Sequence, residues 1–392
     1  MSDKLPDDQQ EDGEDVAQSK QSSAVITATD WTVETILEQL RKGNIELNPD
    51  FQRREAWKVK RKSQFIESLI LGIPVPQIVL AERKNKRGSF IVIDGKQRLL
   101  TLRQFCSPDD TGAFRPFALT ELGIRKDLEK VTYSKLSSDL AYDADYSGFE
   151  NGTIRTAVIR NWPDENFLYT VFLRLNTGSV PLSPQELRQA LHPGGFSKFV
   201  DDFSIDSQLL RQALGLSAPD FRMRDAELVI RFFAFKQFLP TYTGNLKPLL
   251  DATTAYYNSI WNDNKAEVIG RTRELELALQ TTITIFGSEH AFRKWNGKSF
   301  ERPLNRAVFD IMAMYFSRAD IAEIALKKSE AVVSGFQNLC ETDATFRASI
   351  EGTTKSIDAI GTRLNSWGKA LRDILGIQFP VAEIRNDRVH LE

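Results

Sequence analysis

The sequence predicts an α/β domain followed by an all-α helical domain. Three observations support this division. From residue 29 to about 106, apolar residues at helical spacing alternate with short apolar runs of strand length. From Phe196 onward every apolar pattern has helical spacing. The length of 392 residues accommodates two domains at roughly 100 to 200 residues each. We therefore expect an acidic tail over 1–28, the α/β domain over 29–195 and the helical domain over 196–392.

The charges of the chain are unevenly distributed. Residues 1–20 carry seven acids and two bases, with few large apolar side chains, so we expect the first 28 residues to be disordered. Residues 53–62 carry six bases and one acid, and residues 83–103 carry seven bases and one acid. These two basic stretches would attract phosphate groups. The alternative is that these cations lie on solvated helix and turn faces.

Two cysteines, Cys106 and Cys340, stand far apart in apolar surroundings and fit neither a disulfide framework nor metal-ligand spacing. The sequence contains no apolar run of the roughly 18 residues that a membrane span needs, and its acidic start is unlike a secretory signal. We therefore expect a cytoplasmic protein without a membrane partner.

The α/β domain is expected to begin with a helix whose buried face carries Val33, Ile36, Leu37 and Leu40, with Asp30 or Thr32 as its cap and Gly43 as its stop. A short strand (45–47), a turn (48–50) and a second helix ending at Gly72 follow. Two prolines then precede a strand over 77–81, which we place near a sheet edge because proline donates no ladder hydrogen bond. A strand over 89–93 and a helix over 95–106 complete this part.

The segment 136–159 is expected to be irregular structure and a strand that ends near 158–161. Residues 166–175 favour a helix over a strand. Ser183, Pro184 and Glu186 have the spacing of a helix start with a capping box, and that helix should end at 192–195. The helical domain should then contain helices over 226–239, 246–261, 266–286, 303–316, 319–338 and 354–375, arranged as a bundle.

The strand that ends at Ile93 runs through Asp94 and Gly95 directly into a helix. Backbone N–H groups at residues 95–98 would therefore be unpaired and would bind an anion. Gly95 would allow close approach of a ligand, and Lys96 and Arg98 would add positive charge. Asp94 would orient Mg²⁺ or accept a sugar hydroxyl. The structural alternative is an Asp94 N-cap with two solvent-facing cations. The sequence contains neither a Walker loop nor a dinucleotide fingerprint.

Two blocks of motifs resemble a known family. They are Pro49-Asp50-Phe51-Gln52-Arg53-Arg54 with Trp57, residues 65–76 and Ile93-Asp94-Gly95-Lys96-Gln97-Arg98-Leu99 in the first block, and residues 171–178 and 182–188 in the second. Together they resemble the N-terminal domain of GmrSD-type modification-dependent restriction enzymes, which is grouped with ParB and sulfiredoxin-like folds. That family's signature is Asp-Gly-Gln-Gln-Arg, and here Lys96 replaces the first Gln.

The resemblance implies a ParB/sulfiredoxin-like α/β fold that binds, and often hydrolyses, a nucleoside triphosphate (ATP or GTP) with Mg²⁺ in DNA-directed antiphage defence. By motif position, Asp94, Gly95, Gln97 and Arg98 would form the phosphate and metal region, with Asp94, Gln97 and Arg98 in catalysis. Further contacts would come from Lys96, Arg53, Arg54, Arg174 and Asn176. For these arginines and Asn176, a role in salt bridges or capping is an equal alternative.

Several aromatic, basic and histidine residues outside this motif could indicate contacts with nucleic acid or a nuclease activity. Phe51 and Trp57 would stack on a base or pack in the core, and core packing is favoured for Trp57. Residues 289–295 mix aromatic and basic side chains, and a helix end is favoured there over a nucleic-acid contact. His192, His290 and His390 lie far apart in sequence and match no HNH nuclease motif. We therefore expect the helical half to sense a substrate or to dock a separate nuclease or effector subunit.

Two alternative functions remain open. The first is a DNA-binding or sensor module without turnover, whose basic surface grips the DNA backbone. The second is a ParB-like DNA-nicking nuclease that uses Asp94.

Overall fold

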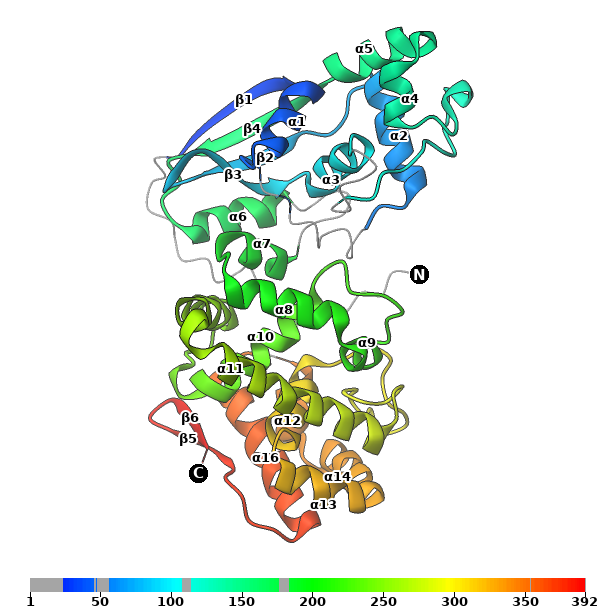
Figure 1. Ribbon diagram of the computed structural model, residues 1–392. Coiled ribbons are helices and arrows are strands. Elements are labelled where there is room, and N and C mark those ends of the chain that lie inside the picture. Colours follow the sequence, from blue (N-terminus) through cyan, green and yellow to red (C-terminus); the bar gives the residue numbers. More distant parts are fainter. Residues whose placement is uncertain are drawn as a thin grey trace. The chain divides into compact units, whose positions relative to one another are not determined.

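The computed structural model describes residues 24–45, 47, 56–107, 114–175, 183–352 and 354–391. The chain divides into two compact units at the junction between Leu191 and His192. We call residues 24–191 the α/β unit and residues 192–391 the helical unit. Figure 1 labels most of the elements of both units.

The α/β unit is built on a four-stranded sheet with the strand order β1-β4-β2-β3. Its strands are β1 (Val25–Thr32), β2 (Ile78–Arg83), β3 (Lys86–Asp94) and β4 (Thr153–Arg160). β1 pairs antiparallel with β4, β2 pairs antiparallel with β3, and β2 and β4 run parallel. Because β3 runs antiparallel to β2, the end of β3 and the start of β2 meet at the same end of the sheet, where Val79 pairs with Asp94.

Helices cover both faces of this sheet because its inner strands are apolar on both sides. The face that carries Ile78 and Leu80 packs against α1 (Val33–Arg41), α2 (Val59–Ile70), α3 (Lys96–Phe105) and α5 (Asp143–Asn151). The opposite face carries Val79 and Ala81 and packs against α6 (Glu165–Leu175) and α7 (Pro184–Leu191). The unit is therefore a three-layer α/β/α sandwich (Figure 1).

Several predicted elements of the α/β unit are confirmed. Thr32 caps α1 by accepting a hydrogen bond from the Thr35 amide, and α6 is helical as favoured. Ser183 and Glu186 form the predicted capping box, since each accepts a hydrogen bond from the other's backbone N–H at 3.1 and 2.7 Å. Such caps can be predicted from the sequence because they depend only on residues that are close together in the chain.

Other predictions for this unit are wrong. Residues 25–28 were placed in a disordered tail, but they belong to β1, whose backbone is held by pairing with β4. β2 was placed near an edge, yet it has partners on both sides, because Pro74 and Pro76 precede the strand and so remove no ladder bond. Where a short strand was expected over 45–47, the described residues show only an isolated bridge between Ile45 and Phe90.

The segment predicted to be irregular contains helices. These are the end of α4 (Tyr133–Ser138), η5 (Leu140–Tyr142) and α5, whereas η4 (Lys126–Leu128) precedes the predicted segment. They are short and carry few apolar residues, so their periodicity is weak; α5 buries only Phe149. The predicted turn over 48–50 lies outside the described residues.

The helical unit contains ten helices that are labelled in sequence order. They are α8 (Gly195–Asp206), α9 (Gln208–Leu214), α10 (Arg224–Phe238), η6 (Leu239–Thr241), α11 (Leu246–Phe286), α12 (Arg306–Phe316), α13 (Ala319–Lys327), α14 (Ser329–Thr342), α15 (Ala344–Glu351) and α16 (Ile357–Leu375) among its described residues. α11 joins two predicted helices across a kink at Asn264. α13 and α14 divide what was predicted as one helix.

The prediction of an all-α helical half needs one correction. A two-stranded hairpin, β5 (Ala382–Arg385) and β6 (Arg388–Leu391), follows α16. Asn386 and Asp387 form its turn with φ of 50° and 53°, as a two-residue hairpin requires. An Asn-Asp turn between four-residue strands is a weak signal, and it was missed.

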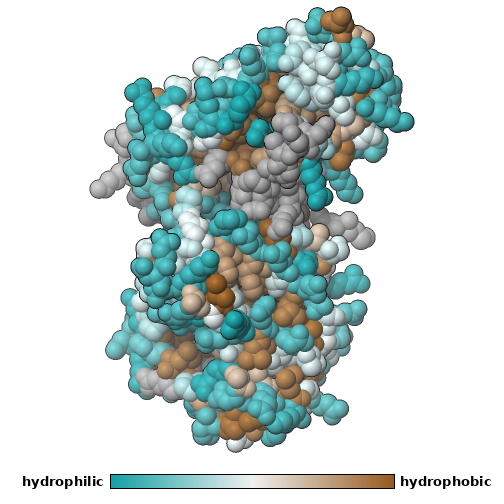
Figure 2. All heavy atoms as spheres, in the orientation of Figure 1, coloured by the Kyte–Doolittle hydropathy of each residue, from teal (hydrophilic) through white to brown (hydrophobic). Residues whose placement is uncertain are grey.

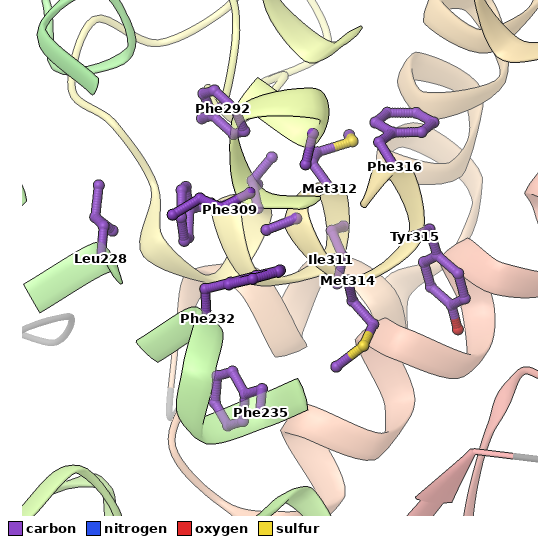
Figure 3. Packing of buried hydrophobic residues seen from close by; sticks show 14 of the residues in the cluster. Leu228, Phe232, Phe235, Phe292, Phe309, Ile311, Met312, Met314, Tyr315 and Phe316 are labelled. Atoms are coloured by element: carbon purple, nitrogen blue, oxygen red, sulfur yellow. The ribbon is translucent and has the colours of Figure 1, made fainter. Parts of the chain in front are cut away.

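The helical unit has one large apolar core (Figure 3). α12 is buried along its whole length, and Phe309 packs against Phe292 with ring centroids 5.4 Å apart. Buried within the same unit is an ionic network in which Asp310 accepts hydrogen bonds from Arg231 and Arg363.

In the view of Figure 2, hydrophilic residues predominate and apolar residues form small, separated patches. Among the described residues, no helix combines the length and the apolar character needed to cross a membrane.

Candidate phosphate-binding site

The predicted strand-turn-helix is present in the α/β unit. Asp94 is the last residue of β3, Gly95 is the N-cap and Lys96 is the first residue of α3. Among the described residues, no side chain caps this helix. The N–H groups of the first helical turn have no acceptor within an α-helix and carry the positive end of its dipole. The start of this ten-residue helix, where Gly95, Lys96 and Arg98 are buried, therefore has the kind of backbone donors that suit an anion.

Gly95 is required at this turn for two reasons. Its φ of 98° lies in the left-handed region, which other residues avoid. In addition, a Cβ at this position would lie 2.9 Å from Cγ1 of Ile78 and 3.4 Å from Nε of Arg98. The turn is thus packed tightly against the start of β2, and only glycine fits it.

Arg98 connects the end of β3 to the residue that precedes β2. Its Nη2 donates to the carbonyl oxygen of Gln77 and to Oδ2 of Asp94, both at 2.8 Å. Arg98 is 5% exposed, whereas the side chain of Asp94 is 32% exposed. Burial lowers the pKa of Arg98, the Asp94 carboxylate opposes this, and the charge of Arg61 lowers it further. Among the described residues, Nε of Arg98 has no hydrogen-bond partner.

Lys96 does not face solvent. Its Nζ lies 2.5 Å from Oε1 of Glu186, and both side chains are buried. The charge that was expected to lie beside a phosphate is therefore compensated within the protein. Glu186 was predicted only as part of a capping box. The available signal was the cation at a position where the family signature has Gln, since a buried lysine needs a counter-ion.

The remaining predicted site residues are placed as follows. Gln97 follows Lys96 in the first turn, and its buried Oε1 has no hydrogen-bond partner among the described residues. Arg174 is exposed in the last turn of α6, and within the described part of the chain no hydrogen bond or ion pair joins it to residues 94–98. Arg53, Arg54 and Asn176 lie outside the described residues.

Arg61 is a further exposed cation of this unit that was not singled out. It is exposed in the first turn of α2, and its guanidinium lies 4.7 Å from the centroid of the Trp57 ring. Its charge acts on Arg98, as noted above. The spacing of four residues between Trp57 and Arg61 was the signal that sequence reasoning overlooked.

The residues present allow Mg²⁺ only in combination with a phosphate. The described part of the chain holds no group of three or more His, Cys, Asp or Glu side chains that would bind a metal ion. Asp94 is one partly exposed carboxylate with one oxygen engaged by Arg98. A magnesium ion that takes one carboxylate together with phosphate oxygens and water fits this donor set.

The comparison with protein families agrees with this part of the chain. Residues 33–193 match the model described as "GmrSD restriction endonuclease, N-terminal domain". These residues belong to that family. The matched residues contain β2, β3 and β4 of the sheet, the turn at Gly95 and the Lys96–Glu186 pair. No curated protein and no solved structure gives a significant match to the chain.

Two other candidate contacts have structural roles. Trp57 is 8% exposed and packs edge-on against Phe65 at 5.8 Å, which confirms core packing; Phe51 lies outside the described residues. In the segment 289–295, Arg293 donates to the carbonyl oxygens of Arg302 and Ala213, and Lys294 pairs with Glu301 and Glu351. These cations serve the fold of the helical unit, but the segment forms turns and an isolated bridge after α11 and not the favoured helix end.

Proposed function

We propose that the GmrSD N-terminal domain of this chain binds a nucleoside triphosphate at the start of α3 and hydrolyses it with Mg²⁺ in restriction-type defence. The observation that carries the proposal is the uncapped start of α3 behind Gly95, flanked by the Asp94–Arg98 pair. Membership in a restriction-endonuclease domain family supports the defence role. DNA and a separate nuclease or effector subunit are the partners that this role implies.

The protein would contribute to hydrolysis mainly by stabilising the negative charge of the phosphate groups. The first-turn N–H groups of α3 would hold phosphoryl oxygens, and Gly95 would let them approach the backbone. Arg98 would stabilise charge that develops on the transferred phosphoryl group. Asp94 would hold Mg²⁺, which when bound neutralises phosphate charge, and Gln97 would orient the attacking water.

Phosphate release from ATP, GTP, CTP and UTP with Mg²⁺ tests the proposal. Asp94→Asn keeps an oxygen for Arg98 but removes the charge, so it should lower release at least about tenfold without unfolding the chain. Arg98→Lys tests the second member of the pair. Asp30→Asn alters an exposed carboxylate of the same unit, paired with Arg155 at 3.4 Å, and should leave release unchanged. Absence of nucleotide binding and of turnover at millimolar ligand would remove the proposal.

A second candidate function is DNA binding without turnover. It is favoured by the exposed cations Lys58, Lys60 and Arg61 at the start of α2. In this case binding of a duplex would weaken steeply with salt, because neutralised phosphates release counter-ions. Steeply salt-dependent DNA binding in a protein that neither binds nor hydrolyses nucleotide would favour this function over the first.

A further inference from the structure

Arg61 is held in place by an aromatic ring instead of a carboxylate. Its guanidinium lies over Trp57, which is itself fixed edge-on against Phe65. A guanidinium over an indole face is stabilised without losing its charge. The side chain is thus positioned while its N–H donors remain available to a ligand.

The neighbouring cations of α2 are used differently. Lys60 pairs with Glu121 at 3.0 Å, and Lys62 is buried with its Nζ 5.8 Å from the Phe117 ring centroid. Among the described residues, Arg61 has no ion pair with any carboxylate. Arg61 thus differs from Lys60 in that no carboxylate among the described residues compensates its charge.

The position of Arg61 relates it to the start of α3. Arg61 lies in the first turn of α2, which packs beside α3 on the same face of the sheet. Arg98, in the first turn of α3, forms an ion pair with Asp94, and its Nε has no hydrogen-bond partner among the described residues. Two guanidinium groups, one paired with Asp94 and one without an ion pair among the described residues, thus lie in the first turns of neighbouring helices on one face of the sheet.

We propose that Arg61 is a second phosphate-binding residue of this site, and that the site therefore selects a polyphosphate over a single phosphate group. This inference rests on the proposed function and deepens it. The α3 amides and Arg98 bind one phosphoryl group, and Arg61 binds the next group along the same chain. A nucleoside triphosphate meets this requirement, whereas a nucleoside monophosphate or inorganic phosphate engages one end only.

Calorimetric titration of the full chain with inorganic tripolyphosphate and with inorganic phosphate tests the inference. Tripolyphosphate is the probe because it presents the phosphate chain without a base or sugar. Arg61→Gln should weaken tripolyphosphate binding by about tenfold to a hundredfold, the range of a lost charge-assisted hydrogen bond, and leave phosphate binding unchanged. Arg61→Lys, which keeps the charge, should retain most of the affinity.

The matched control is Lys60→Gln, which removes the adjacent charge that Glu121 already compensates and should leave both affinities unchanged. Because Arg61 also covers Trp57, Arg61→Met keeps the aliphatic stem over the ring and replaces Arg61→Gln if the latter lowers the thermal midpoint. If Lys60→Gln weakens binding as much as Arg61→Gln, the effect is general electrostatics and the inference is overturned.

The two levels of the proposal fail in different ways. If the wild-type chain binds neither tripolyphosphate nor any nucleoside triphosphate, the proposed function itself fails. If the wild type binds tripolyphosphate and Arg61→Gln binds it equally well, only the role of Arg61 fails. If Arg61→Gln weakens binding of a short DNA duplex but not of tripolyphosphate, Arg61 serves a DNA backbone and the inference is overturned.

Discussion

Nζ of Lys96 lies 2.5 Å from Oε1 of Glu186, which joins the first turn of α3 to the first turn of α7 across 90 residues of sequence. The strands of the sheet pass between these two helices, since α3 packs on one face and α7 on the other. Glu186 uses its second oxygen to accept the Ser183 amide. One carboxylate therefore fixes both the start of α7 and the cation beside the candidate site.

Removing Lys96 should destabilise the protein strongly. Lys96→Met leaves Glu186 as a buried carboxylate without its counter-ion, which costs about 3–5 kcal/mol. The free energy of urea unfolding measures this. Lys327→Met is the control, because Lys327 and Glu323 are 2.6 Å apart but their side chains are 68% and 71% exposed, so its loss should cost less than about 1 kcal/mol. Equal effects of the two changes would show that burial of the Lys96 pair is unimportant.

Substitution of Gly95 should cost more than substitution of a glycine in open space. Gly95→Ala combines a left-handed φ with a Cβ placed 2.9 Å from Ile78, whereas Gly43→Ala meets only the backbone penalty, at φ 68° with no atom within 4 Å. We expect about 1–2 kcal/mol for Gly43→Ala and roughly 1–3 kcal/mol more for Gly95→Ala. Thermal or urea unfolding of both variants distinguishes the two contributions. An equal loss of unfolding free energy at both positions would mean that the turn at Gly95 shifts to accommodate a Cβ without cost.

Glu67 should make the α/β unit sensitive to acid. It is buried and accepts hydrogen bonds from the backbone N–H groups of Gly123, Ile124 and Arg125. Burial alone would raise the pKa of Glu67, but these hydrogen bonds outweigh it and hold the pKa below the ordinary value of 4.5. A depressed folded-state pKa means that the stabilisation is present above pH 4.5 and is lost as the pH falls through the folded-state pKa.

Glu67→Gln tests this pH dependence. The variant should lose about 1–3 kcal/mol at pH 7, where the charged acceptor is replaced by a neutral one, and a smaller amount near pH 3. Glu121→Gln removes an exposed carboxylate of the same loop region and should change stability little at either pH. A loss for Glu67→Gln that is constant from pH 7 to pH 3 would exclude the ionised carboxylate as its cause.

Asp310 should be essential to the helical unit. It accepts hydrogen bonds from Nε and Nη2 of Arg231 and from Nη2 of Arg363, and both arginines are at most 3% exposed. Asp310→Ala leaves two buried guanidinium groups without their shared acceptor and should cost about 3–5 kcal/mol. Asp320→Ala, in an exposed pair with Arg318, should cost about 0–1 kcal/mol by the same unfolding measurement. A small effect at Asp310 would show that water or other groups replace the carboxylate.

Local signals in the sequence predicted the elements that depend on neighbouring residues. The Ser183–Glu186 capping box, the Thr32 cap and the turn at Gly95 fall in this class, because each is set within a few residues. Contacts between distant residues were not predictable in this way. The partner of Lys96 is 90 residues away, and the central position of β2 follows from its pairing with β4. Lys96 and Arg98 could be placed beside Asp94 from the sequence, but the pairing of Lys96 with Glu186 and the contact of Arg61 with Trp57 became clear only from the structure.

A structure of the protein with Mg²⁺ and a non-hydrolysable nucleoside triphosphate tests the proposed site most directly. We predict phosphate oxygens within hydrogen-bond distance, roughly 2.7–3.2 Å, of the first-turn amides of α3, with the guanidinium groups of Arg98 and Arg61 on successive phosphates. A nucleotide bound elsewhere, with the start of α3 in contact only with the protein's own side chains, would contradict the proposal.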